Sequence, residues 1–225
     1  MTQAPELDLT VVDHLLTSTR AVRKRLDLGR PVEDEVLLEC LRLATQAPTG
    51  GNIQHWRWMI VRDEEKRRRV AELYNMAFGP YIQMQEAAVD KSNAQQMRVI
   101  GSAKHLGTIM HEVPVLVIPT ALGRPDEMPA SPGWSNVTAS GFYGSVWPAV
   151  WSFMLALRSR GLGSALTTLH LVFEKEVGEL LGIPETVTQI GLVPVAYFTG
   201  KSFKPAKRRP AEEITYWDAW KNTKP

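Results

Sequence analysis

The segment from Val146 to Leu157 constrains the fold of this chain more than any other stretch of the sequence. It reads VWPAVWSFMLAL, with apolar side chains all round a helix: Trp147, Val150, Trp151, Met154 and Leu155 on one side, and Ala149, Phe153 and Leu157 on the other. Such a helix is buried on all sides, and this one is well short of the roughly 20 apolar residues that a membrane span requires. In a domain of 225 residues, burial of this kind is easiest at a subunit interface. We therefore expect a homodimer, and the alternative is a large monomer core.

The remaining sequence alternates between helical and strand patterns. Spacing of apolar residues predicts helices over 9–18, 33–46, 63–78 and 173–182, and strands over 56–61, 113–122, 164–171 and 188–198. Gly79-Pro80 should end the third helix, and Gly182 with Pro184 beyond it the last one. Residues 81–110 suggest one or two helices or a mobile cap, and 123–134 a loop. No break in composition suggests a linker, so we predict a single α+β domain over 1–225.

Composition excludes several classes of function. The net charge of +2 comes from 26 basic and 24 acidic residues, so no general attraction to nucleic acid is expected. The single cysteine, Cys40, lies in a helical pattern and reads as a buried hydrophobe. The five histidines form no HExxH pattern, so we expect no metal site. The first ten residues lack the features of a secretory signal, and we expect a cytoplasmic protein with no membrane partner.

Two motifs in the first quarter of the chain could bind a ligand. The stretch TRAVRKR places Arg20 and Arg23 just after the first predicted helix, and a compact group of arginines suits a phosphorylated ligand. The loop APTGGNIQ, residues 47–54, has two glycines that permit close backbone approach. Taken singly, each motif is equally compatible with a solvated basic face or an ordinary glycine-rich loop.

Two further motifs lie in the last third of the chain. The stretch GLGSALTT, residues 161–168, resembles a dinucleotide fingerprint at first sight, but Leu166 stands where the third glycine belongs and a helix precedes the turn. Leu166, Thr167 and Thr168 are in a position to present backbone amides and hydroxyls to a planar ligand, but taken alone the motif is explained more simply as a connection from a helix to a strand. The stretch KRRPAEE, residues 207–213, is either a second basic anchor or a charged tail.

In this order, the four motifs resemble the flavin-dependent nitroreductase family, and the resemblance runs from about residue 11 to 220. It implies a mixed, mainly antiparallel sheet flanked by helices, in an intertwined homodimer that holds FMN between the subunits. The tail, residues 200–225, would then pack on the partner subunit, as its Trp217 and Trp220 also suggest.

The resemblance also implies the roles of individual residues. The implied FMN-binding residues are Arg20, Ala21, Arg23, Pro48, Thr49, Gly50, Asn52, Leu166, Thr167, Thr168, Lys207 and Arg208. The arginines and lysine would bind the phosphate or ribityl part, and a backbone N–H of 166–168 would reach flavin N5. Residues 48–52 would come from the other subunit, and Phe142, Tyr143 and Trp147 would wall the substrate pocket. Ala21 replaces a serine and His55 a proline that are frequent in the family.

The implied activity is reduction of nitroaromatic, quinone or similar electron-poor acceptors by NAD(P)H. Hydride passes through flavin N5 in two half-reactions, so no catalytic side chain is expected. Alternatives are a flavin-binding or flavin-storing protein without turnover, and a flavin-dependent reductase or dehalogenase of one metabolite.

Overall fold

The computed structural model describes residues 6–127 and 133–223, so the predicted loop 123–134 lies partly outside the described residues. The chain forms two compact units, residues 20–200 and residues 1–19 with 201–225. The smaller unit contains helix α1 (Leu9–Ser18) and the 3₁₀ turn η4 (Ala211–Glu213). The Asp8 carboxylate accepts hydrogen bonds from the first turn of α1, which is why the helix begins there.

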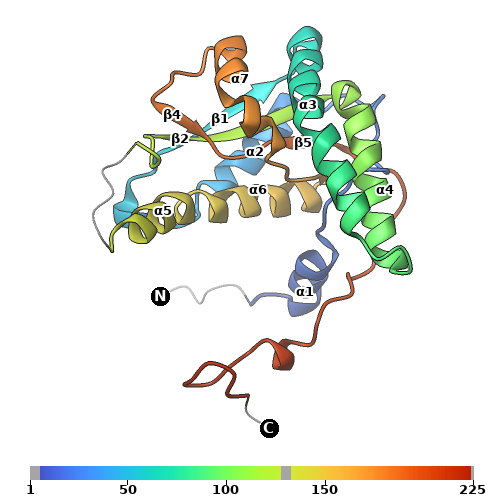
Figure 1. The fold of residues 1–225 in the computed structure, drawn as a ribbon, viewed down its shortest axis with the longest axis vertical. Helices are drawn as coiled ribbons and strands as arrows, with labels where there is room; N and C mark the ends of the chain where they lie inside the picture. The colour runs from blue at the N-terminus through green and yellow to red at the C-terminus, as the bar shows by residue number, and fades with distance from the viewer. Residues whose placement is uncertain (1–5, 128–132, 224–225) are drawn as a thin grey trace. The chain divides into compact units, whose positions relative to one another are not determined.

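The larger unit is built on a five-stranded sheet in which every paired strand is antiparallel (Figure 1). The order is β1 (Trp56–Val61), β2 (Val115–Leu122), β5 (Val193–Tyr197) and β3 (Leu162–Ser164), and β4 (Val187–Gln189) also pairs with β2. The predicted α+β class with a mainly antiparallel sheet is confirmed. The strand predicted over 56–61 has the predicted bounds.

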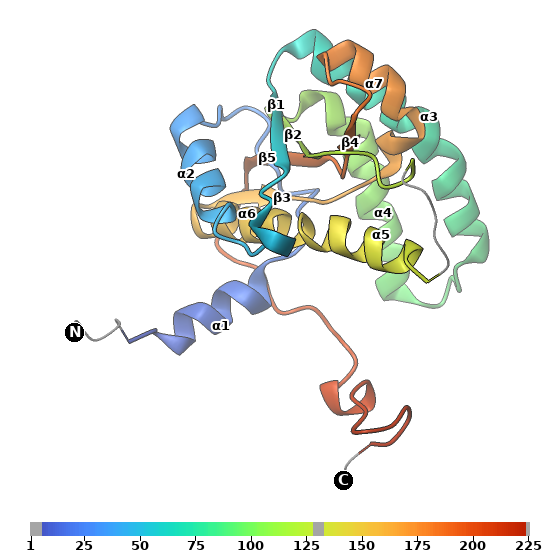
Figure 2. The same cartoon turned by 90° about the vertical axis from the view of Figure 1, so that its left-hand side faces the viewer.

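Strand β2 is buried on both faces of the sheet. Its residues Val115, Val117 and Ala121 pack in a core with α2 (Asp34–Ala44) and α6 (Trp147–Ser159). The alternate residues Leu116 and Ile118 point to the opposite face, over which α3 (Glu64–Ala88) and α7 (Glu174–Leu181) lie (Figures 1 and 2). A strand covered on both faces explains the continuous apolar run in the sequence.

Pro119 lies within β2, a position that proline usually disfavours because it has no N–H to donate. On one side it faces Trp58 of β1. On the other, β2 pairs with β5 through residue 117 and with β4 from residue 120. Pro119 therefore lies where β2 changes partner, and its carbonyl accepts a hydrogen bond from the N–H of Ile190 at 2.9 Å.

Helix α6 is less buried than expected. Its residues Val150, Phe153 and Leu157 are in the core, but Trp151 keeps 44% of its surface exposed. Within one chain the helix is therefore not buried on all sides, and its burial at a subunit interface stays a prediction. An apolar face remains on this helix that the chain itself does not cover.

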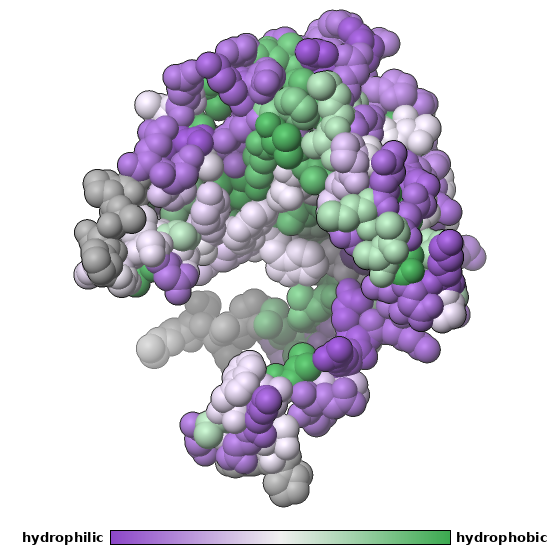
Figure 3. All heavy atoms as spheres, in the orientation of Figure 1, coloured by the Kyte–Doolittle hydropathy of each residue, from purple (hydrophilic) through white to green (hydrophobic). Residues whose placement is uncertain are grey.

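The region of residues 81–110 is a helical hairpin. Helix α3 continues through Pro80 to Ala88, and α4 (Ala94–Ile109) follows. The predicted helix end at Gly79-Pro80 is wrong, because Phe78 and Ile82 on either side of the proline are both buried and their packing offsets one lost hydrogen bond. Exposed large hydrophobic side chains of this hairpin include Tyr81, Met84 and Met97, and Figure 3 shows hydrophobic residues interspersed with hydrophilic ones over α3 and α4.

Another local prediction is wrong. Of the strand expected over 164–171, only Ser164 belongs to β3, and residues 169–173 form the 3₁₀ helix η3 (Leu169–Phe173). Helix α5 (Ser135–Gly144) was not expected, since its three glycine and alanine positions and its polar residues give a weak apolar pattern. The C-terminal cap of α7 is as predicted, with Gly182 at φ 70°. No helix of the described residues is both long and apolar enough to cross a membrane.

Candidate functional site

The arginine motif is attached directly to the glycine motif. The Val22 N–H donates to the Ser164 carbonyl at 2.8 Å, and Ala21 forms a parallel bridge with Ser164 at the edge of the sheet. A Cβ atom at Gly163 would lie 2.8 Å from Cγ1 of Val22. Gly163 therefore permits the close approach of the two segments, which together form one wall of the site.

A cavity of about 420 Å³ opens beside this junction. Its lining comes from Arg23, from α3 and α4, and from the segment after β3: Tyr74, Phe78, Tyr81, Ile82, Gln85, Val99, Ile100, Ala103, Leu106, Leu166, Thr167, Thr168 and Leu169. Four of the predicted cofactor-binding residues thus meet in one cavity. Most of its lining residues are apolar, and its polar side chains are those of Arg23, Gln85, the two threonines and the two tyrosines.

The polar side chains of this cavity are partly withdrawn from water. Arg23 donates from Nη1 to Oγ of Ser102 at 3.0 Å, and burial lowers the pKa of its guanidinium. Burial also raises the pKa of the Tyr74 hydroxyl, an effect that a hydrogen bond with the Thr167 side chain opposes. A partly desolvated guanidinium attracts anionic and carbonyl groups more strongly than one in bulk water.

The segment 166–168 is held by its neighbour in the sheet. The Thr167 N–H donates to the Leu192 carbonyl at 3.0 Å, and the Leu192 N–H donates back at 2.7 Å. A Cβ atom at Gly191 would lie 2.9 Å from Cδ1 of Leu166 and 3.6 Å from Cη2 of Trp147. Gly191 therefore brings the predicted pocket wall Trp147 close to Leu166.

The loop 48–54 does not line the cavity of Arg23. Its middle forms the 3₁₀ turn η1 (Gly50–Asn52), and the Gly50 N–H donates to Oγ of Ser145 at 3.0 Å. The predicted residues Pro48, Thr49, Gly50 and Asn52 are therefore grouped beside α5 instead. Within one chain, the structure does not bring this group together with the arginine motif.

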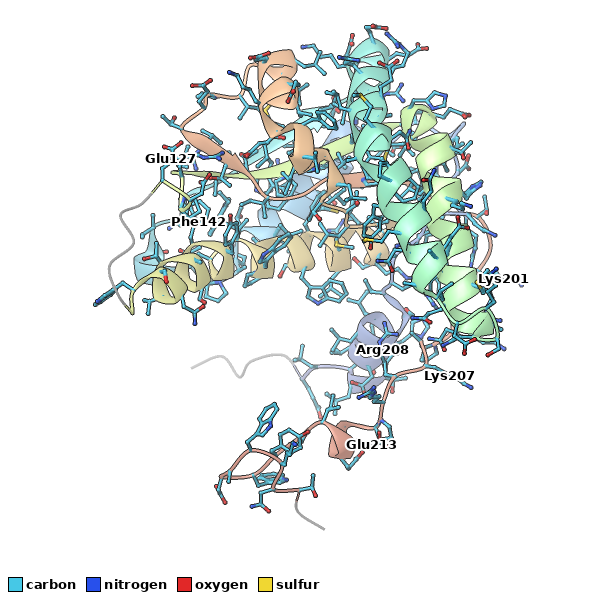
Figure 4. The ribbon with its side chains drawn as sticks, viewed as in Figure 1. Glu127, Phe142, Lys201, Lys207, Arg208 and Glu213 are labelled. Atoms are coloured by element: carbon cyan, nitrogen blue, oxygen red, sulfur yellow. The ribbon has the colours of Figure 1, made fainter. Side chains whose placement is uncertain are left out.

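Phe142 and Tyr143 are near this loop and also lie outside the cavity lining. Phe142 points from α5 toward the strands (Figure 4), and its ring centroid is 4.9 Å from that of His55 and 5.3 Å from that of Tyr143. His55 keeps only 8% of its surface exposed, and burial lowers its pKa. The three predicted pocket walls thus separate into Trp147 near Leu166 and an aromatic pair near the loop.

The remaining predicted anchors are exposed. Arg20 is exposed at the start of the larger unit. Lys207 and Arg208 belong to the smaller unit (Figure 4), where Arg208 donates from Nη1 to the Lys207 carbonyl at 3.1 Å. No group of three or more metal-ligating side chains occurs among residues 6–127 and 133–223.

The model of the Nitroreductase family matches residues 16–197 of this chain. The chain belongs to the nitroreductase family. The matched range includes the arginine motif, the loop 47–54 and the glycine motif, and it stops before the basic tail. The resemblance inferred from the four motifs is confirmed at the level of the family.

Individual relatives of this nitroreductase-family chain differ in their named activities. It is 28% identical over 188 residues to an iodotyrosine deiodinase of Thermotoga neapolitana, covering 81% of this chain and 86% of the relative. It is 27% identical over 216 residues to an NADH dehydrogenase of Thermus thermophilus, and the match covers 90% of this chain and 97% of the relative. Among solved structures, an oxidized iodotyrosine deiodinase bound to FMN and 3-iodo-L-tyrosine is similar in fold, with a TM-score of 0.63, 23% identity and coverage of 90% and 96%.

Sequence reasoning did not single out several residues that shape the nitroreductase-family site. Tyr74 and Ser102 lie in helices whose functional faces have no local motif, and each is far along the chain from its partner. Gly191 and Ser145 act through close approach and through one hydrogen bond, respectively. Of these residues, Gly191 has a sequence signal, because a glycine at the start of the apolar strand pattern 191–198 is typical of a close backbone approach.

Proposed function

We propose that this chain is an FMN-dependent NAD(P)H oxidoreductase that reduces nitroaromatic, quinone or similar electron-poor acceptors. The observation that carries the proposal is the meeting of Arg23 with residues 166–168 in one cavity of about 420 Å³. The relatives named as an NADH dehydrogenase and as an FMN-bound deiodinase support the reductant and the cofactor.

The residues present fit the chemistry of a flavin. A flat ring system with a polar edge needs apolar walls and a few directed donors, and the cavity offers both around Arg23, Thr167 and Thr168. When bound, FMN supplies hydride transfer between NAD(P)H and the acceptor, so the chain needs no acid, base or nucleophile of its own.

The chain's own residues would bind and orient the cofactor. Arg23 would bind an anionic or carbonyl group of FMN, and Arg20 would add positive charge at the same end of the motif. Because the Thr167 N–H is bonded to Leu192, the amides of Leu166 and Thr168 are the candidates for the donor to flavin N5. Lys207 and Arg208 would approach the phosphate from the tail.

The proposed site requires a second copy of the chain. Pro48, Thr49, Gly50 and Asn52 lie outside the cavity that Arg23 lines, so in this proposal they contact the FMN of the partner subunit. The exposed face of α6 around Trp151 would be covered in the same interface, and the tail from residue 200 would pack on the partner. We propose that the single nitroreductase-like domain and its tail function only as a homodimer.

The second candidate function is reduction of a narrower class of substrate. The relative that is 28% identical is named as an iodotyrosine deiodinase, which favours reductive removal of halogen from an aromatic metabolite. A comparison of nitroaromatic, quinone and halogenated aromatic acceptors under the same reductant would distinguish the two candidates.

The decisive experiment is the visible spectrum of the purified protein before and after anaerobic addition of NADH or NADPH. We expect flavin absorption that bleaches with at least one of them. A flavin spectrum that stays oxidised with both would favour the storage alternative. A colourless protein that does not take up added FMN would contradict the proposal.

A further inference from the structure

Helix α5 and Ser145, the residue that caps its C-terminus, hold the loop 50–55 at two points. At one end the Gly50 N–H donates to Oγ of Ser145, 3.0 Å away. At the other end the His55 ring packs on Phe142, with centroids 4.9 Å apart and planes at 59°. Ser145 keeps 6% of its surface exposed whereas Gly50 is exposed, so the bond is shielded from water on its serine side.

The Ser145 hydroxyl has a fixed direction. It donates its one hydrogen to the Gly141 carbonyl at 2.7 Å, and its lone pairs are then available to the Gly50 N–H. A Cβ atom at position 50 would lie 3.3 Å from Oγ of Ser145. Gly50 and Ser145 therefore form a matched pair in which the glycine permits the approach and the serine accepts the bond.

The backbone between the two points adopts conformations that L residues rarely take. Gly51, Asn52 and Gln54 have φ of 56°, 54° and 52°. Side-chain bonds support this shape, because Nε2 of Gln54 donates to Oδ1 of Asn52 at 2.9 Å and the Gln54 N–H donates to Oγ1 of Thr49 at 3.3 Å. Such conformations persist only where the surrounding structure holds them.

We propose that Ser145 is a positioning residue for cofactor binding. It fixes the loop that carries Thr49, Gly50 and Asn52 in its strained shape, and it does so from the helix that carries Phe142 and Tyr143. The inference rests on the proposed function, in which this loop contacts FMN. A side chain that does not touch the cofactor then sets part of the affinity for it.

The test compares Ser145→Ala and Ser145→Thr with the matched control Ser159→Ala. The Ser159 hydroxyl also donates to a helix carbonyl, that of Ala156 at 2.8 Å, but it holds no loop. FMN dissociation constants are measured by flavin fluorescence on the flavin-free protein. Hydrogen exchange of the 49–54 peptide is measured without FMN.

For Ser145→Ala we expect at least tenfold weaker FMN binding and faster exchange of the 49–54 peptide. Ser145→Thr, which keeps the hydroxyl, should restore both, and Ser159→Ala should leave both unchanged. Unchanged FMN affinity in a folded Ser145→Ala variant overturns the proposal, even where exchange accelerates.

A second variant covers the case in which Ser145→Ala does not fold. Gly50→Ala crowds the same hydroxyl from the loop side, and it should also weaken FMN binding and accelerate exchange. Wild-type protein that binds no FMN would refute the proposed function itself, and the exchange data would then still report whether Ser145 holds the loop.

Discussion

The guanidinium of Arg23 donates a hydrogen bond to the hydroxyl of Ser102, a residue 79 positions further along the chain. This bond links the arginine motif to helix α4 and orients the charge toward the cavity that Thr167 and Thr168 also line. Together with the hydrogen bond between Tyr74 and Thr167, it joins the α3–α4 hairpin to the edge of the sheet in one site.

Replacing Arg23 should weaken cofactor binding and leave the fold intact. We expect Arg23→Ala to weaken FMN binding by about 10- to 100-fold, since a hydrogen bond to a charged group contributes about 1.5–3 kcal/mol. Titration of flavin-free protein with FMN measures the change. The neighbouring exposed Lys24→Ala is the control, and equal losses in both variants would argue against a specific role for Arg23.

Gly163 should not tolerate a side chain. The added methyl group of Gly163→Ala would lie 2.8 Å from Cγ1 and 2.9 Å from Cβ of Val22, and overpacking of this kind costs about 1–3 kcal/mol. We expect a lower free energy of unfolding by denaturant titration. Gly101→Ala, on a helix position with open space around it, should be neutral or stabilising, and an equally destabilised Gly101→Ala would refute the steric explanation.

His170 should make the fold sensitive to acid. Its side chain is fully buried, and burial lowers its pKa from 6.5 to about 4. Neither ring nitrogen has a hydrogen-bond partner within the described residues. Because the folded state favours the neutral ring, the stabilisation is complete above pH 6.5 and is lost progressively as the pH falls toward 4.

The expected loss across this pH range is about 3 kcal/mol, from about 1.4 kcal/mol for each unit of pKa difference. His170→Phe should remove this part of the pH dependence and keep the stability at pH 8 close to that of the wild type. Denaturant titrations at pH 8 and pH 5 test this, with the exposed His111→Phe as control. If His170→Phe loses as much free energy of unfolding between pH 8 and pH 5 as the wild type, the acid sensitivity belongs to other groups.

Trp151 should be needed for self-association. The residue keeps 44% of its surface exposed on a helix whose opposite face is buried in the core, and a charged residue there would oppose burial against a second copy. Sedimentation should show a dimer for the wild type and a shift toward monomer for Trp151→Glu. The exposed Val172→Glu on η3 serves as control, and a Trp151→Glu variant that stays dimeric would place the interface elsewhere.

Local pattern predicted the elements that tertiary contacts do not override. The strand Trp56–Val61 and the helix Leu9–Ser18 have their predicted bounds because their residues favour these conformations and their ends carry turn or capping residues. Helix α3 passes Pro80 because buried Phe78 and Ile82 flank it. Residues 165–168 do not continue strand β3, because an isolated bridge between Thr167 and Leu192 takes the place of a continuous ladder.

From the sequence, only those residues of the candidate site that belong to a local motif could be predicted. Arg23, Thr167 and Thr168 were named from sequence and meet in one cavity. The bond between Gly50 and Ser145 joins residues 95 positions apart, and no local pattern encodes such a pair. The placement of Lys207 and Arg208 against the cavity stays a prediction, as do the second subunit's contributions.

The change of partner along β2 at Pro119 has an effect on the site. Because no ladder continues across this proline on the β4–β5 side, residues 190–192 leave β2 after the bond to Ile190 and turn to Thr167. This detour delivers Gly191 to Leu166 and Trp147. The missing N–H of one proline on a central strand thus separates the ladders of β5 and β4, and the chain that crosses between them contacts Leu166, a residue of the cavity lining.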